Sequence, residues 1–143
     1  MANLDLPVPP LELGDVAKGS RRIVPITGGA FAGPLLRGIV LPGGADWQVL
    51  RSDSVAELEA RYTLRTDDGA LIYVRNLALR YGPPDVMAAL ATGGPVDPGD
   101  YYFRGATAFE TSAIHYAWLM KHIIICTGAR EPARVTLRFY KVT

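Results

Sequence analysis

The stretch from Ala56 to Arg80 constrains the fold more than any other part of the chain. Two runs rich in Tyr, Thr, Ile, Val and Leu flank Asp68-Gly69, a combination that is typical of a β-hairpin. A two-residue turn at Asp68-Gly69 predicts that Tyr62 lies opposite Arg75, whereas a three-residue loop would turn the second strand over. With the two-residue turn, one face is apolar apart from a single guanidinium, as in a ligand pocket or a buried ion pair; it carries Leu58, Ala60, Tyr62, Leu64, Leu71, Tyr73 and Arg75.

Composition limits the class of protein. The 143 residues are 49% hydrophobic and 20% charged, which fits one globular domain. The formal net charge is +1 and the basic residues are scattered, so nothing favours nucleic acid or an anionic membrane as a partner. No stretch approaches the roughly 18 apolar residues of a membrane span. The lone Cys126 excludes an internal disulfide, and because the start has no signal-peptide pattern we expect a cytoplasmic protein.

The rest of the sequence predicts mostly short strands, separated by turns at about ten-residue spacing. Residues 1–10 are expected to form an extended lead-in to a single domain spanning residues 11–143. The expected helix is Asp85 to Ala91, which follows a proline pair and precedes Gly93-Gly94. A long strand is expected from Ile114 to Cys126.

This pattern is typical of an all-β protein, either a sandwich or a single antiparallel barrel of about eight to ten strands with one short helix. Closure into a barrel is favoured because many strands are apolar on one face and mixed, rather than fully polar, on the other. An eight-stranded barrel has room for its own side chains and one small ligand. The glycine-rich segment 28–34 lacks the spacing of a phosphate-binding loop, so we expect it to form a barrel corner.

Several motifs in a fixed order resemble the bacterial and fungal family known as domain of unknown function 3237. The resemblance extends over nearly the whole chain from about Leu11, and it is carried by Ile26-Thr27-Gly28-Gly29 with Gly33-Pro34, Leu41 to Trp47, Arg61-Tyr62 with Asp68-Gly69, Ile72 to Asn76, Tyr102-Phe103-Arg104, Phe109-Glu110-Thr111 and Tyr116-Ala117-Trp118-Leu119. It implies a lipocalin-like or allene-oxide-cyclase-like β-barrel that is often oligomeric. Such barrels include carriers as well as cofactor-free cyclases and isomerases, so the fold alone does not choose between these functions.

The chain differs from the usual pattern of this family at two positions. Met120 stands where the family often has Asn, and Ala78 stands where it often has Gly. Met120 is expected on the same face as Tyr116 and Trp118, so an adaptable thioether takes the place of the usual amide there.

Three common kinds of catalytic or metal site lack support. His115 and His122 are seven residues apart, so on one regular strand they point to opposite faces and cannot share a metal ion. No Gly-x-Ser-x-Gly motif marks a serine nucleophile. Cys126 ends an apolar run, where the role of a small buried hydrophobic residue is expected. We therefore expect neither a metal nor another cofactor.

Two carboxylates are candidates for acid–base chemistry. If its face lines the barrel, Asp46 would either pair with Arg75 or Arg104 or act as a general base with a raised pKa. Otherwise it would cap the preceding glycine turn. Glu110 is the second candidate, and its alternative is a solvated acid at a loop end. An arginine among aromatic side chains suits a carboxylate, enolate or phenolate ligand, or else joins strands through an ion pair.

Aromatic side chains complete the expected site. A tyrosine hydroxyl inside the barrel can donate to a developing oxyanion, and the alternative is that these rings are ordinary core. The predicted catalytic set is Asp46, Glu110, Arg104 and Tyr73. The predicted ligand-binding residues are Trp47, Tyr62, Arg75, Tyr102, Tyr116, Trp118 and Met120.

Three functions are compatible with these residues. The first is a cofactor-independent enzyme that transfers a proton in a small apolar or aromatic carbonyl or carboxylate compound, through isomerisation, cyclisation or addition–elimination. The second is a non-catalytic protein of lipocalin type that binds a small hydrophobic ligand. The third is a structural subunit of an oligomer. We expect a small-molecule partner for the first two and a homo-oligomer in general.

Overall fold

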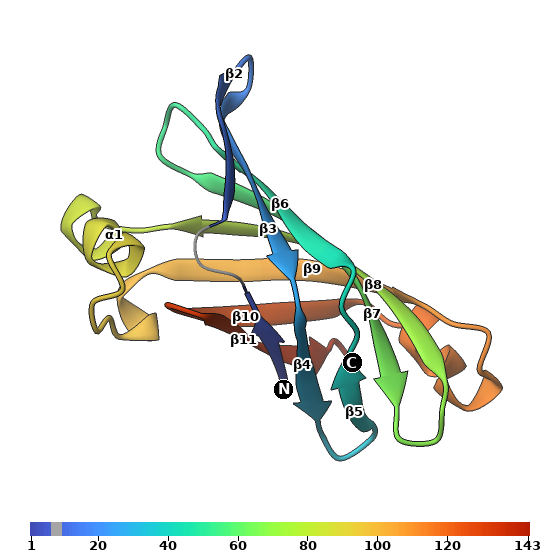
Figure 1. The fold of residues 1–143 in the computed structure, drawn as a ribbon. Helices are drawn as coiled ribbons and strands as arrows, with labels where there is room; N and C mark the ends of the chain where they lie inside the picture. The colour runs from blue at the N-terminus through green and yellow to red at the C-terminus, as the bar shows by residue number, and fades with distance from the viewer. Residues whose placement is uncertain (7–9) are drawn as a thin grey trace.

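The computed structural model describes residues 1–6 and 10–143, and its centre is a closed antiparallel barrel of eight strands (Figure 1). In order around the barrel the strands are β7 (Ala56–Thr66), β5 (Arg37–Val40), β4 (Gly28–Ala32), β1 (Ala2–Asp5), β11 (Arg134–Lys141), β10 (Ile124–Glu131), β9 (Tyr102–Glu110) and β8 (Leu71–Tyr81), which pairs again with β7. The predicted antiparallel barrel is confirmed.

Three further strands extend the sheet outside the barrel and form a flap: β2 (Leu11–Val16), β3 (Gly19–Ile26) and β6 (Gly44–Leu50). The flap joins the barrel through β6, which pairs with the first half of β7, while β5 pairs with the last residues of the same strand. Figure 1 shows the β2–β3 hairpin projecting beyond the barrel. The long strand β7 therefore belongs to both parts.

The glycine-rich segment carries the chain from the flap into the barrel, as expected for a corner. Strand β3 passes into β4 through Thr27, and the φ angles of Gly28 and Gly29 are 156° and 138°. A Cβ atom on Gly29 would lie 1.9 Å from the carbonyl oxygen of Asn3 in β1. Only glycine allows the two strands to approach so closely.

The amino-terminal segment is part of the barrel rather than only a lead-in. Strand β1 pairs with both β4 and β11, and its Ala2 and Leu4 side chains are buried in the core. The expectation of extended backbone at residues 7–9 lies outside the described residues.

The helices differ in part from expectation. Helix α1 (Pro84–Ala91) begins one residue before the predicted start and ends where predicted. A short 3₁₀ turn, η1 (Pro98–Asp100), follows it. The prediction of one strand from Ile114 to Cys126 is wrong, because η2 (Ile114–Met120) is a 3₁₀-helix and β10 begins only at Ile124. No helix among residues 1–6 and 10–143 is long and apolar enough to cross a membrane.

The hairpin of β7 and β8 contains the three-residue loop, residues 67–69, and not the two-residue turn. The backbone nitrogen of Thr66 donates to the oxygen of Ala70 at 2.9 Å, and Gly69 has a φ of 88°. Tyr62 consequently lies opposite Val74. The second strand is turned over relative to the two-residue prediction, so Arg75 lies on the outer face.

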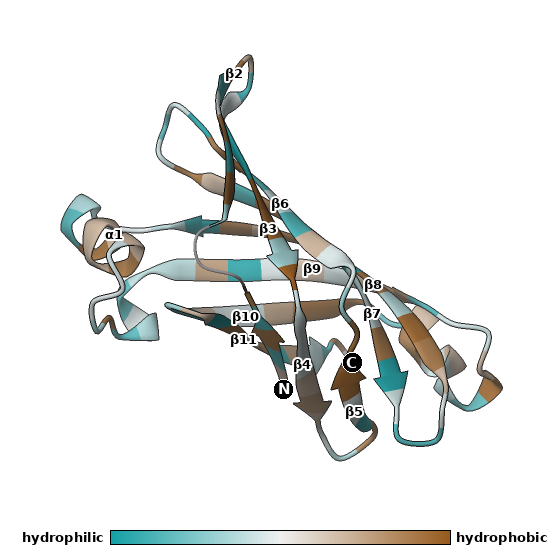
Figure 2. Ribbon diagram, viewed as in Figure 1, coloured by the Kyte–Doolittle hydropathy of each residue, from teal (hydrophilic) through white to brown (hydrophobic). Residues whose placement is uncertain are grey.

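Alternation along the barrel strands separates the core from the outer surface. Residues of alternating exposure follow one another along β7, β8 and β9, and Figure 2 shows the hydropathy changing along single strands. Tyr62, Ile72 and Val74 fill the middle of the barrel. The interior is therefore packed at its centre, and space for ligands is found towards the two ends.

Substitution of Gly128 by alanine is expected to destabilise the fold. The ring of Phe103 occupies the space beside Gly128, and an added Cβ would lie 2.7 Å from three of its carbons. Overpacking of this kind costs about 1–3 kcal/mol in the free energy of unfolding, which urea denaturation can measure. Gly33→Ala is the control, since its Cβ would meet only Leu36 O at 3.7 Å. Equal stabilities of the two variants would contradict the expectation.

Candidate functional site

A cavity of about 510 Å³ lies between α1 and the flap. Its polar lining includes three arginines, Arg22, Arg80 and Arg130, with Gln48 beside them, and also the carboxylate of Glu12, whose Oε1 lies 4.0 Å from Nη1 of Arg22. Apolar side chains of α1, including Met87 and Leu90, form another wall. We call this cavity the arginine chamber. Figure 1 shows α1 at one end of the molecule and η2 near the opposite end.

Strand alternation brings the three guanidinium groups together. Arg80 is the last of five alternate buried residues on β8, a series that includes Asn76. On β10, Arg130 follows Cys126 and Gly128 at the same spacing of two. Arg22 on β3 is paired directly with Gln48 on β6. Each arginine thus continues the inward face of its strand towards the α1 end of the barrel.

Arg80 is a buried cation whose guanidinium has few partners. The residue is 6% exposed, and its guanidinium carbon lies 5.5 Å from the centre of the Phe103 ring. Its Nε has no hydrogen-bond partner in the described part of the chain, and none of the ion pairs found there involves it. Burial, together with the positive charges of Arg130 and Arg22, lowers the pKa of Arg80 to about 10.

The carboxylate of Asp46 is hydrogen-bonded to the side chain of Gln48. The Nε2 atom of Gln48 donates to Oδ2 of Asp46 at 2.7 Å, and Nε of Arg22 donates to Oε1 of Gln48 at 2.6 Å. The other carboxylate oxygen, Oδ1, is buried and has no hydrogen-bond partner among residues 1–6 and 10–143. Burial raises the pKa of Asp46 above its usual value, although the Gln48 hydrogen bond and the three arginine charges oppose this shift.

The arrangement can hold an anion next to a weakly acidic carboxyl group. Guanidinium groups recognise carboxylates and enolates through paired hydrogen bonds, and their effect is larger where water is excluded. A buried carboxylate with a raised pKa is a stronger base than an exposed one, which suits it to accept a proton from a bound compound. Among the described residues, no cluster of three or more His, Cys, Asp or Glu side chains could hold a metal ion.

The predicted catalytic residues are divided between the two faces of the barrel. Asp46 is inside and interacts with Arg22, Arg80 and Arg130 rather than with Arg75 or Arg104. Tyr73 lies outside because the three-residue loop turns β8 over, and it is 38% exposed. Arg104 and Glu110 lie on the exposed face of β9. Of this set only Asp46 lies near the arginine chamber; it does not line the chamber but borders a small neighbouring cavity of about 20 Å³ and is hydrogen-bonded to Gln48, which does line it.

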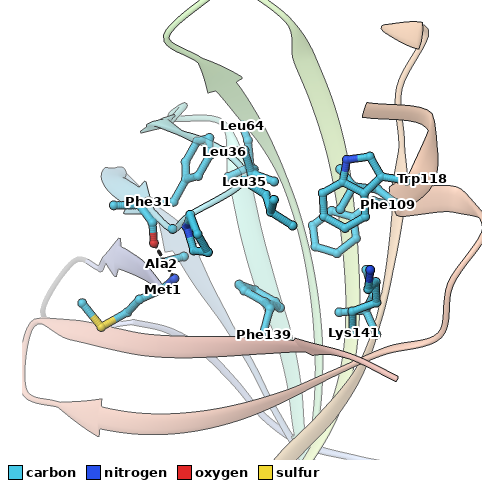
Figure 3. A pocket seen from close by; sticks show the side chains of 15 residues that line it. Met1, Ala2, Phe31, Leu35, Leu36, Leu64, Phe109, Trp118, Phe139 and Lys141 are labelled. Carbon is cyan, nitrogen blue, oxygen red and sulfur yellow. Dashed lines mark hydrogen bonds between the residues drawn. The ribbon is translucent and has the colours of Figure 1, made fainter. Parts of the chain in front are cut away.

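The predicted ligand-binding residues are also spread over the molecule. Tyr62 is buried in the middle of the barrel, where its hydroxyl oxygen has no partner in the described structure. Trp118 lines a separate apolar pocket, which is drawn in Figure 3. Four of them are exposed on the flap, the barrel or η2: Trp47, Arg75, Tyr102 and Met120. Tyr116 bonds to the β7–β8 loop.

Sequence reasoning missed the three arginines that form the chamber. Arg80 carries a usable signal, because it is an even number of residues from Ile72 and Val74, whereas the pairing of Arg22 with Gln48 is seen only in the structure. Choosing the three-residue loop would have placed Arg80 inside. Arg130 lies between Gly128 and Pro132, two residue types that often interrupt strands, so its position on β10 had no comparable signal.

The β7–β8 loop holds η2 in place through Asp68. The Nε2 atom of His115 lies 2.6 Å from its carboxylate, and the Tyr116 hydroxyl donates to it at 3.1 Å. Hydrogen bonds from Thr66 and His115 lower the pKa of Asp68 to about 2. Their contribution is present above the unfolded-state value of 3.8 and is lost as the pH falls towards 2.

Asp68→Asn is therefore expected to let η2 open more often at neutral pH, because the charged partner of His115 is removed. Amide hydrogen exchange at Tyr116 and Lys121, whose N–H groups bond within this segment, should become faster. Asp67→Asn in the same loop is the control and should leave these rates unchanged. Unchanged exchange in Asp68→Asn would show that the loop does not hold η2.

Comparison with known proteins finds relatives that the chain matches over most of their length. The family model described as "Protein of unknown function (DUF3237)" matches residues 1–142. A UPF0311 protein of Rhodopseudomonas palustris (strain TIE-1) is 45% identical over 90% of this chain and 84% of its own. A UPF0311 protein of Clostridium acetobutylicum is 44% identical over 94% of this chain and 85% of its own.

Solved structures agree with this assignment. A conserved protein of unknown function from Rhodopseudomonas palustris has a TM-score of 0.96 and 39% identity over 99% of this chain and 93% of its own. A β-barrel-like protein from Acinetobacter baumannii has a TM-score of 0.86 and 41% identity over 99% and 91%. An enzyme from Penicillium herquei, at 21% identity and a TM-score of 0.66 over 98% and 91%, shares the fold. The chain belongs to the DUF3237 family, as its motifs had indicated.

Proposed function

We propose that the arginine chamber binds a small organic anion and that the protein catalyses a cofactor-independent proton transfer on it. The observation that carries this proposal is Arg80, a buried guanidinium that forms no ion pair in the described chain, although the charge of the nearby Asp46 acts on it. Burying a charge is costly unless it is paired, so an unpaired buried cation at a cavity wall fits an anionic ligand. Perturbed groups of this kind are concentrated at functional sites.

The proposed substrate is a small apolar or aromatic compound with a carboxylate or an enolisable carbonyl. The guanidinium groups would hold its negative charge and stabilise an enolate as it forms. Met87 and Leu90 would contact its apolar part. Asp46 would act as the base once a substrate group replaces Gln48 as its partner. Isomerisation, cyclisation and addition–elimination all begin with such a proton abstraction.

The test is hydrogen–deuterium exchange, which does not require the product to be known. The protein is incubated in D2O with a panel of aryl and alkyl keto acids, and proton NMR follows the signal next to the carbonyl. Loss of that signal faster than in protein-free solution is expected for at least one compound. Saturable binding without exchange would favour the carrier function instead, and an absence of both would reject the chamber as a site.

We also propose that the chain forms a homo-oligomer. Support comes from the outer face of β8, where Arg75 interrupts a row of exposed apolar side chains: Leu71, Tyr73, Leu77, Leu79 and Tyr81. The last three follow one another without a break, and exposed apolar surface of this kind marks interaction sites. Sedimentation should give a mass above 15.5 kDa for the wild type and a lower mass for Leu77→Arg. A wild-type mass equal to one chain would reject the proposal.

A further inference from the structure

A second cavity, of about 200 Å³, opens at the end of the barrel opposite the arginine chamber. Ala56 borders the chamber and Leu64 borders this second cavity, so the two are separated by about 26 Å of strand β7. The side chains of Tyr62, Ile72 and Val74 fill the barrel between them. The two cavities are therefore separate sites. We call the second one the aromatic pocket.

The walls of the aromatic pocket are mostly flat apolar rings. Figure 3 shows Phe31, Phe109, Trp118 and Phe139 arranged around one space, with Leu35 projecting into it. Phe109 and Phe139 touch edge to face, with their ring centres 5.7 Å apart. Edge-to-face packing leaves ring faces available to a third ring. An engineered apolar cavity of about 150 Å³ already accommodates benzene, so this volume suits one substituted ring.

The side-chain ammonium of Lys141 lies at the rim of this apolar space. The Nζ atom of Lys141 is 5.7 Å from the centre of the Trp118 ring. No ion pair engages it within residues 1–6 and 10–143. A cation that rests on an aromatic face beside an apolar cavity can meet the anionic end of a ligand whose ring lies inside.

We propose that the aromatic pocket is a second ligand site, which binds a single-ring aromatic carboxylate with its ring between the phenylalanines and Trp118 and its carboxylate at Lys141. The charged groups of the two cavities differ. The flexible ammonium group of Lys141 lies at the rim of the aromatic pocket, whereas three guanidinium groups line the arginine chamber. The proposal does not depend on catalysis by Asp46.

The experiment titrates the full chain with 4-fluorophenylacetate and follows binding by ¹⁹F NMR, with 4-fluorotoluene as the neutral probe. Two variants are made in exposed side chains so that the fold is retained. Lys141→Met removes the charge but keeps most of the stem, and it should weaken binding of the acid by about fivefold without changing binding of the neutral probe. Leu35→Glu places a carboxylate in the wall of the pocket and should abolish binding of the acid in this pocket. Leu35 is 62% exposed.

The controls are Lys18→Met and Leu13→Glu in the flap, which should bind both probes as the wild type does. Arg80→Met should also bind the fluorinated acid normally in this pocket, which separates the proposal from the proposed function of the chamber. The proposal is overturned if the acid does not bind saturably. It is equally overturned if Arg80→Met removes the binding, or if Lys141→Met and Leu35→Glu both leave it unchanged.

Discussion

Replacing Arg80 by methionine is expected to abolish anion binding in the arginine chamber and to raise the melting temperature of the free protein. Removal of a desolvated charge that pairs with a ligand weakens binding by about 2–5 kcal/mol, or at least about thirtyfold. In the free protein the same guanidinium is buried beside Arg130 and Arg22, and its lowered pKa shows that its charge is disfavoured there. Methionine can keep the contact with Phe103.

Stabilising substitutions at functional sites typically add about 1 kcal/mol to the free energy of unfolding. For a chain of this length, that raises the melting temperature by about 3 °C. Calorimetry measures the melting temperature, and isothermal titration with the keto acid that shows exchange measures binding. Arg75→Met is the control, because Arg75 lies on the same strand but on the outer face. Two results would contradict this role of Arg80, in which it binds the anion and destabilises the free protein. One is normal anion binding by Arg80→Met, and the other is a melting temperature below that of the wild type.

The length of one loop decided how much of the site could be predicted from the sequence. The turn signal at Asp68-Gly69 located the hairpin correctly, and the alternation on β7 identified the buried face of Tyr62. Since side chains alternate with a period of two, one additional loop residue moves every side chain of β8 to the opposite face. Two hydrogen bonds at Thr66 distinguish the loops: its backbone N–H donates to the oxygen of Ala70, and its hydroxyl oxygen accepts from the N–H of Ala70. The local sequence pattern does not encode them.

The error at η2 has a different physical cause. Alternation of apolar residues after Ile114 is compatible with a strand, and short apolar runs do not separate strand from helix. Contacts from elsewhere in the chain determine the outcome: Asp68 binds His115 and Tyr116, and Leu119 is buried in the core. These contacts join residues about fifty positions apart, so a reading of neighbouring residues could not foresee them.

The cavities at the two ends of the barrel are lined by chemically different side chains. Inward positions near the start of β7 and the end of β8 face the arginine chamber, whereas inward positions near the β7–β8 loop face the aromatic pocket. Tyr62, Ile72 and Val74 fill the centre of the barrel, and they separate the charged arginine chamber from the apolar aromatic pocket. A ligand of either cavity must therefore enter from its own end, and the chemistry of each end can be tested independently.

Asp46→Asn is expected to remove catalysis while retaining anion binding. A positioned general base contributes about 10²–10⁴-fold to a proton transfer, so the exchange rate in D2O should fall by about that factor. Asparagine has nearly the same shape and can still interact with Gln48, and the three arginines that hold the anion are unchanged. The comparison of exchange by NMR with binding by titration separates a base from a residue that only positions Gln48.

The stability of the same variant provides a second check. Because burial raises the folded-state pKa of Asp46 above 3.8, folding favours the protonated carboxyl, and this contribution is lost as the pH rises through the folded-state pKa. The neutral amide of the variant has no charge to bury at any pH. Asp46→Asn should therefore gain in melting temperature relative to the wild type as the pH rises through the folded-state pKa of Asp46. A variant that is less stable at pH 7, yet still catalyses exchange, would make Asp46 a structural partner of the arginines and not the base.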